Sequence, residues 1–547
     1  SFAMNDSHII YAELLSSIVR HNNFSTILYF GPEEARERCQ LEHWLRWTGN
    51  AIPWLIWRSV MTLKLRQFIN AELLVLACLP GVYRRDLLNS VSQSLQHLRQ
   101  TKVLIELASK EDVGLVSRVL VFCRQNEMLN VAAIFTGFGQ THALYSYAAY
   151  PQFELRRQVF GEQLYSLYAE QGLDLRGFRL RTQPDLSEPN SILSYDKEGK
   201  PRLFGYVWNM LTEYARKHNA QLELSYIPEQ NKPLSHIQVL DLARDGYVDI
   251  AASVQPVTMR YLERYHEYAY PVHMGSWCTM LPKEQLVGVR DSYTWLMPVK
   301  TMCLLCLLWL LYELLRGRWQ RHRRLLSIGW WLLAVLLATN VQGRLVSLFV
   351  APTSKAPITS FAALHKSKLR VFGLRSEYNA YDFDMRTKYS ATFQLSDKMS
   401  ELISLRNTLN TSFAYTVTHT KWLLYAEQQA HSTRPLFYFS KDLCFYQFVP
   451  FALVIPENSP HRAALDRLML QLGQSGLYDY WTAKSFQYMV QAGRLQKRNF
   501  SEPHIIRPLR TKDLHHVFFA YAFGVLICLT LFAGELILLR LRRSWSI

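Results

Sequence analysis

Three aspartates at intervals of four residues, Asp241, Asp245 and Asp249, are a group whose residue type and spacing could do chemistry. Carboxylates close together are the usual ligands of a hard divalent cation. Here the surrounding sequence favours another interpretation, because VLDLARDG predicts a helix and YVDIAASV predicts a strand. Asp241 and Asp245 then lie on a solvated helix face ahead of the strand that contains Asp249. His236 and His273 stand alone nearby, and lone histidines are typical of structural roles.

Motifs for catalysis are missing from the chain. It contains no Ser-His-Asp order, no H-E-x-x-H zinc motif and no phosphate-binding P-loop. Cys303 and Cys306 form a C-x-x-C pair, but they lie inside an apolar stretch, and the other six cysteines show no metal-binding spacing. We therefore expect a protein that is not an enzyme and that uses neither a metal nor a cofactor. The sequence does not reveal which cysteines form disulfides.

Three apolar stretches are long enough to cross a membrane, and they would determine on which side of it the other parts of the chain lie. A hydrocarbon core of about 30 Å needs roughly 20 helical residues at about 1.5 Å each. The expected transmembrane helices cover 293–315, 325–350 and 515–541. The alternative is a set of buried helices in a large soluble protein, because charge inside a bilayer is costly. The charged residues that interrupt the stretches are Lys300, Glu313, Arg344 and Glu535.

Basic residues predict the orientation of these helices. Five arginines crowd the loop 316–324, and Arg542 and Arg543 begin the tail 542–547, so both are expected in the cytoplasm. The rest is then extracellular, with a signal peptide already removed ahead of Ser1. The sequons all fall on this external side, and the glycosylation sites are expected at Asn5, Asn23, Asn410 and Asn499. A net charge of +17 could indicate a nucleic-acid binder, but the densest basic run lies at the membrane, so we expect no nucleic acid.

The external parts have the alternating strand and helix pattern of an α/β fold. Residues 1–172 predict an N-terminal α/β domain with a doubly wound, mostly parallel sheet, which is either a ligand or assembly domain or a spacer. Residues 173–290 read as strand, helix, strand, helix, strand, and 351–512 continue the pattern after the membrane hairpin. The two intervals are expected to form one binding domain with two lobes. A ligand site is expected in the cleft between the lobes.

This layout resembles the ionotropic glutamate receptor superfamily, and most closely its divergent insect chemosensory branch, the ionotropic receptors. The resemblance is carried by four stretches in the family's order: FGYVWNMLTEYARKHNAQLELSY, GYVDIAASVQPVTMRYLERYHEYAYPVHMGS, ATNVQGRLVSLFVAPTSKAPITSFAAL and FALVIPENSPHRAALDRLMLQLGQSGLYDYW. It implies a periplasmic-binding-protein-like domain split by a transmembrane hairpin. It covers the chain from about residue 175 to the end.

The resemblance also implies positions for ligand-binding residues. In the family an arginine of the first lobe clamps a carboxylate. That position falls on Leu262, with Arg260 and Arg264 on either side as candidates, although both could equally lie on a solvated helix face. Thr258, Ser376 and Thr418 complete the expected ligand set, and Thr418 replaces the family's acidic anchor. Neither the arginine nor the acidic residue that anchors the family's ligands is present at its matching position in this chain. Glutamate and glycine are therefore not the expected ligands.

The membrane part departs from the family in two places. NVQGRL, from Asn340 to Leu345, replaces the family's SYTANL gate, so Asn340 and Arg344 are the candidate gate residues. The loop 316–324 is too short for a re-entrant pore segment, which needs a half-helix of roughly ten residues and a return. Either the polypeptide has no pore loop, or part of the coding sequence is missing from it.

The resemblance implies a subunit of a chemosensory ligand-gated cation channel. Its partners would be a small chemical ligand, the lipid bilayer and co-receptor subunits in a hetero-oligomer, a tetramer in the family. Its location would be the plasma membrane, in the family that of a sensory neuron dendrite. The alternative is a non-conducting, membrane-anchored ligand-binding or adaptor subunit.

Overall fold

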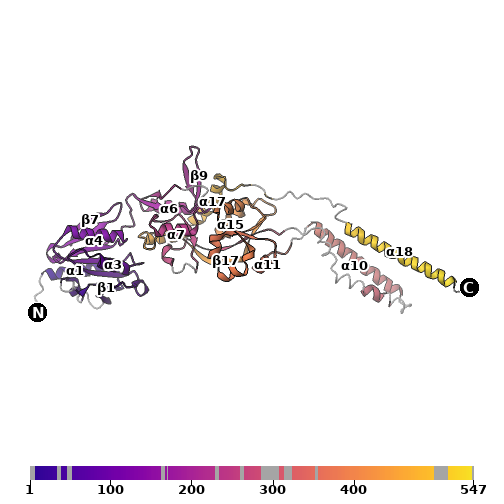
Figure 1. The fold of residues 1–547 in the computed structure, drawn as a ribbon, viewed down its shortest axis with the longest axis horizontal. Helices are drawn as coiled ribbons and strands as arrows, with labels where there is room; N and C mark the ends of the chain where they lie inside the picture. The colour runs from indigo at the N-terminus through magenta and orange to yellow at the C-terminus, as the bar shows by residue number, and fades with distance from the viewer. Residues whose placement is uncertain are drawn as a thin grey trace. The chain divides into compact units, whose positions relative to one another are not determined.

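The computed structural model describes residues 6–33, 38–45, 52–161, 167–168, 170–227, 233–258, 264–284, 307–312, 314, 323–350, 355–497, 500 and 515–544 (Figure 1). The chain divides into two compact units. Unit 1 comprises Ser1–Leu281, Ser360–His431 and Phe437–Asn499, and unit 2 comprises Pro282–Thr359, Ser432–Leu436 and Phe500–Ile547. Sheets and helices are mixed throughout unit 1, which confirms the expected α/β class.

Unit 1 begins with a seven-stranded sheet in the order β2-β1-β3-β4-β5-β6-β7. The first five strands in this order pair in parallel, and β6 and β7 are antiparallel. The mostly parallel sheet that the sequence predicts is therefore present. The strands are β1 (Thr26–Phe30), β2 (Trp54–Trp57), β3 (Leu73–Pro80), β4 (Lys102–Ala108), β5 (Val131–Phe135), β6 (Ala143–Ala148) and β7 (Glu154–Val159).

Helices cover both faces of this sheet, because its central strands are apolar on both sides. In β3, Leu74 and Leu76 join the core formed with α1, whereas Leu73 and Val75 join the core formed with α3 and α4. The apolar run of β3 therefore fills two layers at once. The helical elements here are α1 (Asp6–Arg20), α2 (Leu41–Leu45), η2 (Leu65–Gln67), α3 (Arg85–Ser94), α4 (Val113–Gln125) and α5 (Phe138–Thr141).

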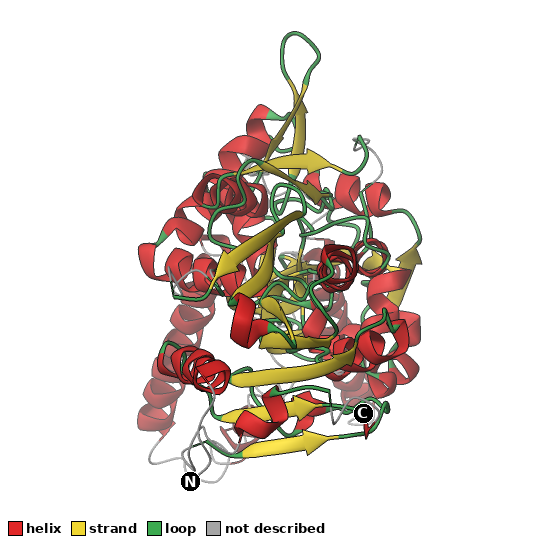
Figure 2. Cartoon of the chain, turned by 90° about the vertical axis from the view of Figure 1, so that its left-hand side faces the viewer, coloured by secondary structure: helices red, strands yellow, loops and turns green. Residues whose placement is uncertain are grey.

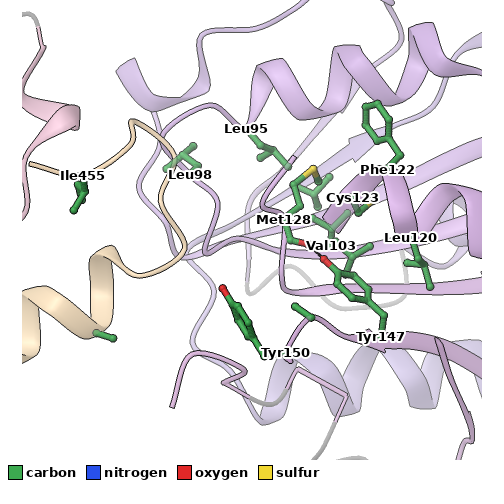
Figure 3. Close-up of a cluster of buried hydrophobic side chains, with 14 of the residues drawn as sticks. Leu95, Leu98, Val103, Leu120, Phe122, Cys123, Met128, Tyr147, Tyr150 and Ile455 are labelled. Atoms are coloured by element: carbon green, nitrogen blue, oxygen red, sulfur yellow. Dashed lines mark hydrogen bonds between the residues drawn. The ribbon is translucent and has the colours of Figure 1, made fainter. Parts of the chain in front are cut away.

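The α3–α4 core continues into the part of unit 1 that lies beyond the apolar stretches. Figure 3 shows Leu98, Met128, Tyr147 and Tyr150 of the N-terminal domain, with Ile455 from the later sequence in the same cluster. Tyr147 donates a hydrogen bond to the Met128 carbonyl at 2.5 Å. One continuous apolar core thus joins sequence regions about three hundred residues apart.

A buried carboxylate supports the start of α2. Glu106 of β4 is fully buried and accepts hydrogen bonds from the backbone N–H groups of Gln40 and Leu41 at 2.8–2.9 Å. Burial raises the pKa of Glu106 to about 7, against the lowering effect of these donors. Cys39, next to this site, forms a disulfide with Cys78 of β3.

After residue 173 the described part of the chain builds three further sheets, two of them with two strands and one with six. We call residues 173–284 the first segment and residues 355–497 the second segment. The first segment contains β8 (Phe178–Thr182), β9 (Ile192–Tyr195), β10 (Pro201–Phe204), α6 (Tyr206–Lys217), β11 (Ala220–Leu224), α7 (His236–Arg244), β12 (Val254–Pro256) and β13 (His273–Pro282). β8 and β11 pair in parallel, and β9 and β10 form a hairpin that projects from its surroundings (Figures 1 and 2).

A six-stranded sheet combines the two segments in the order β12-β17-β13-β16-β14-β15. β12 and β13 come from the first segment, and β14 (Val371–Leu374), β15 (Phe393–Ser396), β16 (Ala414–Thr418) and β17 (Phe437–Leu453) come from the second. Cys278 of β13 forms a disulfide with Cys444 of β17. The two segments therefore fold together, although the apolar stretches separate them in sequence.

The second segment supplies the helices around this sheet. In α16, Ala464, Leu465, Leu468, Met469 and Leu472 are buried, as their spacing predicts, and the helix ends at Gly476 with φ +71°. The helical elements are α11 (Phe361–Lys366), α12 (Arg375–Ala380), α13 (Phe383–Lys388), η6 (Ser390–Thr392), α14 (Met399–Asn407), α15 (His419–Gln428), α16 (Arg462–Ser475) and α17 (Leu477–Gln491).

The described part of unit 2 contains two long helices, α10 (Arg323–Val350) and α18 (His515–Ser544). Within the described residues, one segment, Tyr521–Leu538, is long and apolar enough to cross a membrane, and none of it is buried by protein. The described part of the chain therefore contains one candidate membrane-spanning helix, at the third expected position. The expected helix 293–315 is described at 307–312 and 314 alone, so the total of three spans stays a prediction.

Candidate functional site

A cavity lies where the first and second segments meet, and we call it the central cavity. Its volume is about 30 Å³, which is close to the space that one water molecule occupies in the liquid. The first segment contributes Ser187, Asn190, Tyr206, His236, His273 and Trp277 to its lining. The second segment contributes Glu377, Arg406, Thr416, Thr418, Thr420 and Lys421. Side chains thus leave little open space at this point, although both segments also line larger cavities of about 400 and 700 Å³.

One wall of the central cavity is a loop folded around Asp185. The buried Asp185 carboxylate accepts four hydrogen bonds of 2.7–3.0 Å. Its Oδ1 accepts from the Ser187 backbone N–H and the Ser191 hydroxyl. Its Oδ2 accepts from Asn190 Nδ2 and the Ser253 hydroxyl. Burial raises the pKa of Asp185, and these donors act in the opposite direction. The carboxylate thereby fixes Ser187 and Asn190 in their positions at the cavity.

The opposite wall carries Lys421, which belongs to the first turn of α15. Its ammonium group donates a hydrogen bond of 2.8 Å to the Ser187 hydroxyl, across the junction of the two segments. Within the described residues Lys421 forms no ion pair, although an ammonium group has three donors. Burial and, to a smaller degree, the nearby charge of Arg406 lower the pKa of Lys421 to about 8, against the raising effect of Glu377, Asp185 and Glu188.

Aromatic rings close the cavity on a third side. The His273 ring stacks between Phe451 and Tyr478, with centroids 4.9 and 5.0 Å away. Its Nε2 lies 3.2 Å from the Thr420 hydroxyl, and its buried Nδ1 has no hydrogen-bond partner within the described residues. Burial lowers the pKa values of His236 and His273 to about 4, so both rings are neutral at pH 7. Both histidine rings therefore bring polar nitrogen atoms to the cavity but no charge.

A polar network beside the cavity also joins the two segments. Arg406 donates to the Tyr425 hydroxyl at 2.9 Å and to the Thr416 carbonyl at 3.1 Å. The Tyr425 hydroxyl donates to Asn407, whose side-chain amide donates to Glu188 of the first segment at 3.2 Å. Burial raises the pKa of Glu188, and the charge of Arg494, 3.4 Å away, opposes this effect. Arg406 is thus held in place while it lines the cavity.

The structure brings one of the ligand-binding candidates to this cavity. Thr418 lines it and accepts a hydrogen bond from the Lys421 backbone N–H as the N-cap of α15. Ser376 instead lines a second cavity of about 700 Å³, with Gln183 and Lys398, which we call the side cavity. Thr258 is buried, with a hydroxyl that has no partner within the described residues, and Arg264 is exposed. Arg260 lies outside the described residues.

The other candidates are placed as follows. Asn340 and Arg344 lie in α10 and are exposed within unit 2. Asn23 is exposed after α1, and Asn410 is half-buried in a turn after α14, where its side chain accepts from the Ser412 N–H. Asn5 and Asn499 lie outside the described residues. The structure bears on the positions of these residues but tests none of their roles.

Two of the three aspartates form ion pairs, and the three do not form a metal-binding cluster. Asp241 pairs with Arg244 at 3.4 Å, and Asp249 pairs with Arg181 at 2.6 Å. No group of three or more histidine, cysteine, aspartate or glutamate residues that could hold a metal occurs in the described part of the chain. The solvated interpretation holds for the exposed Asp241 and Asp245, whereas Asp249 joins a bidentate contact with an arginine.

Sequence reasoning missed Lys421, Glu377, Arg406 and Asp185. A signal for Lys421 was available, because it follows three residues after Thr418 in the turn from strand SFAYTVT to the next helix. That turn points the first helical residues toward a cleft in α/β folds. The sequence contained no such signal for Arg406 and Glu377. They reach the central cavity because α12 and α14 pack against the sheet.

Comparisons with known proteins give no family for this chain. No model of a known protein family matches it, and no curated protein is similar to it.

Proposed function

We propose that the chain is a subunit of a chemosensory ligand-gated cation channel that works in a hetero-oligomer. The observation that carries this proposal is the course of β13. His273 and Trp277 of this strand line the central cavity, and the strand ends at Pro282, where the chain enters unit 2 and its apolar helices. A ligand that changes the separation of the two segments would therefore act directly on the connection to the membrane helices.

Two further features support an extracellular sensor. The disulfides Cys39–Cys78 and Cys278–Cys444 suit an oxidising compartment. The 18-residue segment Tyr521–Leu538 of α18 suits a membrane anchor. In the proposed arrangement the N-terminal domain and both segments are external, three helices cross the plasma membrane, and the tail is cytoplasmic.

The proposed coupling requires a ligand that binds one separation of the segments more tightly than the other. The cavity of about 30 Å³ represents the contracted arrangement, in which Lys421 and Ser187 are in contact. A ligand that holds this arrangement would shift the channel equilibrium by its difference in affinity for the two states.

The test is a recording of membrane current in cells that express the full chain with and without co-receptor subunits. We expect no current from the chain alone, because the loop 316–324 lacks a pore segment, and a ligand-dependent current in the hetero-oligomer. An epitope inserted in the exposed β9–β10 turn, at Glu198, should be accessible to antibody on intact cells, and one at the C-terminus should not. An inaccessible turn epitope on a protein at the cell surface would refute the proposed topology.

The same short loop favours a second candidate, a non-conducting ligand-binding or adaptor subunit. The two candidates differ in the ion selectivity of the assembled channel. If this chain contributes to the pore, Arg344→Gln should change the permeability ratio of the hetero-oligomer. An unchanged ratio together with a changed ligand response would favour the adaptor.

A further inference from the structure

The N-terminal domain meets the later sequence at a pair of stacked histidine rings. The rings of His97 and His266 are nearly parallel, with an angle of 15° between them and centroids 3.5 Å apart. His97 follows α3 in the N-terminal domain, and His266 belongs to the first segment. His97 Nε2 also lies 2.5 Å from the carboxylate of Glu457, which belongs to the second segment. We call these three residues the histidine junction.

Backbone contacts hold His97 in this position. Its N–H donates a hydrogen bond of 2.9 Å to the side-chain oxygen of Asn458, and the Gln96 side-chain amide donates to Glu457 at 3.1 Å. His97 has φ +64°, a conformation that costs energy for a residue with a side chain and persists only where its surroundings support it. The bond from His97 to Asn458 therefore breaks when the N-terminal domain leaves the second segment.

Apolar packing beside the junction supports the same contact. Leu98, next to His97, and Ile455, two residues before Glu457, belong to one buried cluster (Figure 3). These side chains do not titrate. A response to pH at this place must therefore come from the charged and titratable groups around the rings.

Cations outnumber carboxylates around the two rings. Arg462 of α16 donates to the His266 carbonyl, and Arg66 of η2 is close enough for its charge to act on the His266 ring. Arg99 interacts with Glu457 by charge. Among the described residues, the other titratable groups beside the junction are Asp466, near Arg462, and Tyr265, whose ring lies 3.7 Å from that of His266. A proton on each histidine would place like charges 3.5 Å apart among these arginines.

The N-terminal domain contributes to the electrostatic surroundings of His266. Burial lowers the pKa of His266 from 6.5 to about 4, the charges of His97, Arg462 and Arg66 lower it as well, and Glu457 opposes them. Once the domain is released, His266 is exposed and regains its ordinary pKa. The released form then binds more protons between pH 4 and 6.5, so the contact is strongest above pH 6.5 and weakens as the pH falls to 4.

We propose that the histidine junction is a pH-sensitive contact, which holds the N-terminal domain on the two segments at neutral pH and weakens when the stacked rings are protonated. The N-terminal domain thereby gains a regulatory role, because its attachment responds to the acidity of its surroundings. This inference does not depend on the proposed channel function.

The test is hydrogen exchange of the full-length protein in lipid nanodiscs, with mass spectrometry that resolves the His97 amide. This N–H exchanges when its bond to Asn458 opens, so its rate, divided by the intrinsic rate at each pH, gives the opening constant of the junction. We expect this constant to rise roughly 10-fold from pH 7.5 to pH 5. The full shift at His266 would give about 30-fold, and solvent around the half-buried rings reduces the effect.

His266→Phe keeps a stacked ring that cannot take up a proton, and it should remove most of this rise. His266→Gln, a smaller neutral side chain, makes the same test should phenylalanine disturb folding, which thermal unfolding reveals. His431→Phe, at an exposed residue, is the matched control and should keep the wild-type rise. The amides of β4 are the internal reference, because they exchange only when the N-terminal sheet itself opens.

Three results would overturn the proposal. The first is an opening constant in wild type that does not change with pH. The second is an equal rise in wild type and both His266 variants, which would assign the effect to another group such as Glu457. The third is a rise at β4 as large as that at His97, because unit 1 would then open as a whole. None of these results bears on the channel function, and an absence of current leaves the histidine junction untouched.

Discussion

At the scale of a single residue, the buried Asp185 determines the geometry of the central cavity although it does not line it. Four hydrogen bonds satisfy its carboxylate, and they order the loop that presents Ser187 and Asn190. Its neighbour Ser187 then meets Lys421 from the other segment. The position of the bond that crosses the cavity is thus set by a residue behind it.

We expect Asp185→Asn to destabilise unit 1 by about 2–3 kcal/mol, because the new amide N–H₂ group would face donors that now require an acceptor. The measurement is the thermal unfolding midpoint of the full chain, compared with Asp442→Asn, a change of the same type at an exposed residue of β17. Equal midpoints for the two variants would mean that the network around Asp185 contributes little.

At the scale of elements, the start of α6 shows how closely this helix packs against the loop that contains Asn190. Gly205, the N-cap of α6, has φ +112°, and a Cβ there would lie 2.5 Å from the Asn190 carbonyl oxygen and 2.7 Å from that of Pro189. The same Asn190 carbonyl accepts a hydrogen bond from the Val207 N–H of α6 at 3.1 Å. The helix and the loop therefore pack backbone to backbone, which requires a residue without a side chain.

Gly205→Ala should move the loop away from α6 and destabilise the protein by about 2 kcal/mol or more, through strain at positive φ and the clash with backbone oxygens. Gly172→Ala is the control, because a Cβ at Gly172 meets nothing within 4 Å. Thermal unfolding measures the stability of both variants. A Gly205→Ala protein as stable as the control would contradict the close packing.

At the scale of the whole molecule, buried histidines couple the stability of unit 1 to pH. Burial lowers the pKa values of His236, His273 and His461 from 6.5 to about 4. The unfolded chain then binds more protons between pH 4 and 6.5, so the stability from these groups is present above pH 6.5 and is lost as the pH falls to 4. Burial raises the pKa values of Glu106 and Glu127 to about 7, so at these two groups the folded chain binds more protons between pH 4.5 and 7. Their contribution to stability is therefore lost as the pH rises from 4.5 to 7.

His461→Asn should isolate one histidine contribution. His461 is buried and contacts the Tyr214 hydroxyl through Nδ1 at 3.1 Å. The variant should be less stable than wild type at pH 7, and this difference should shrink at pH 4.5 by up to roughly 3 kcal/mol. His431→Asn, at an exposed residue, serves as the control. A difference between wild type and His461→Asn that does not vary with pH would show that His461 keeps its ordinary pKa in the folded protein.

The sequence alone determined the local features of this protein. Period-two and period-3.6 patterns predicted the α/β class, the parallel strands of the N-terminal domain and the buried face of α16, because these depend on residues near one another in the chain. The apolar composition of Tyr521–Leu538 likewise predicted a helix that protein does not bury.

The tertiary structure alone decided which distant residues meet. Lys421 reaches Ser187 over 234 positions, Cys278 pairs with Cys444, and Thr418 and Ser376 separate into different cavities. No local pattern encodes such encounters, since they follow from the pairing of β12 and β13 with strands that lie beyond the apolar stretches. A buried charge is tolerated where the whole fold supplies its surroundings, so its position becomes evident only once those surroundings are assembled.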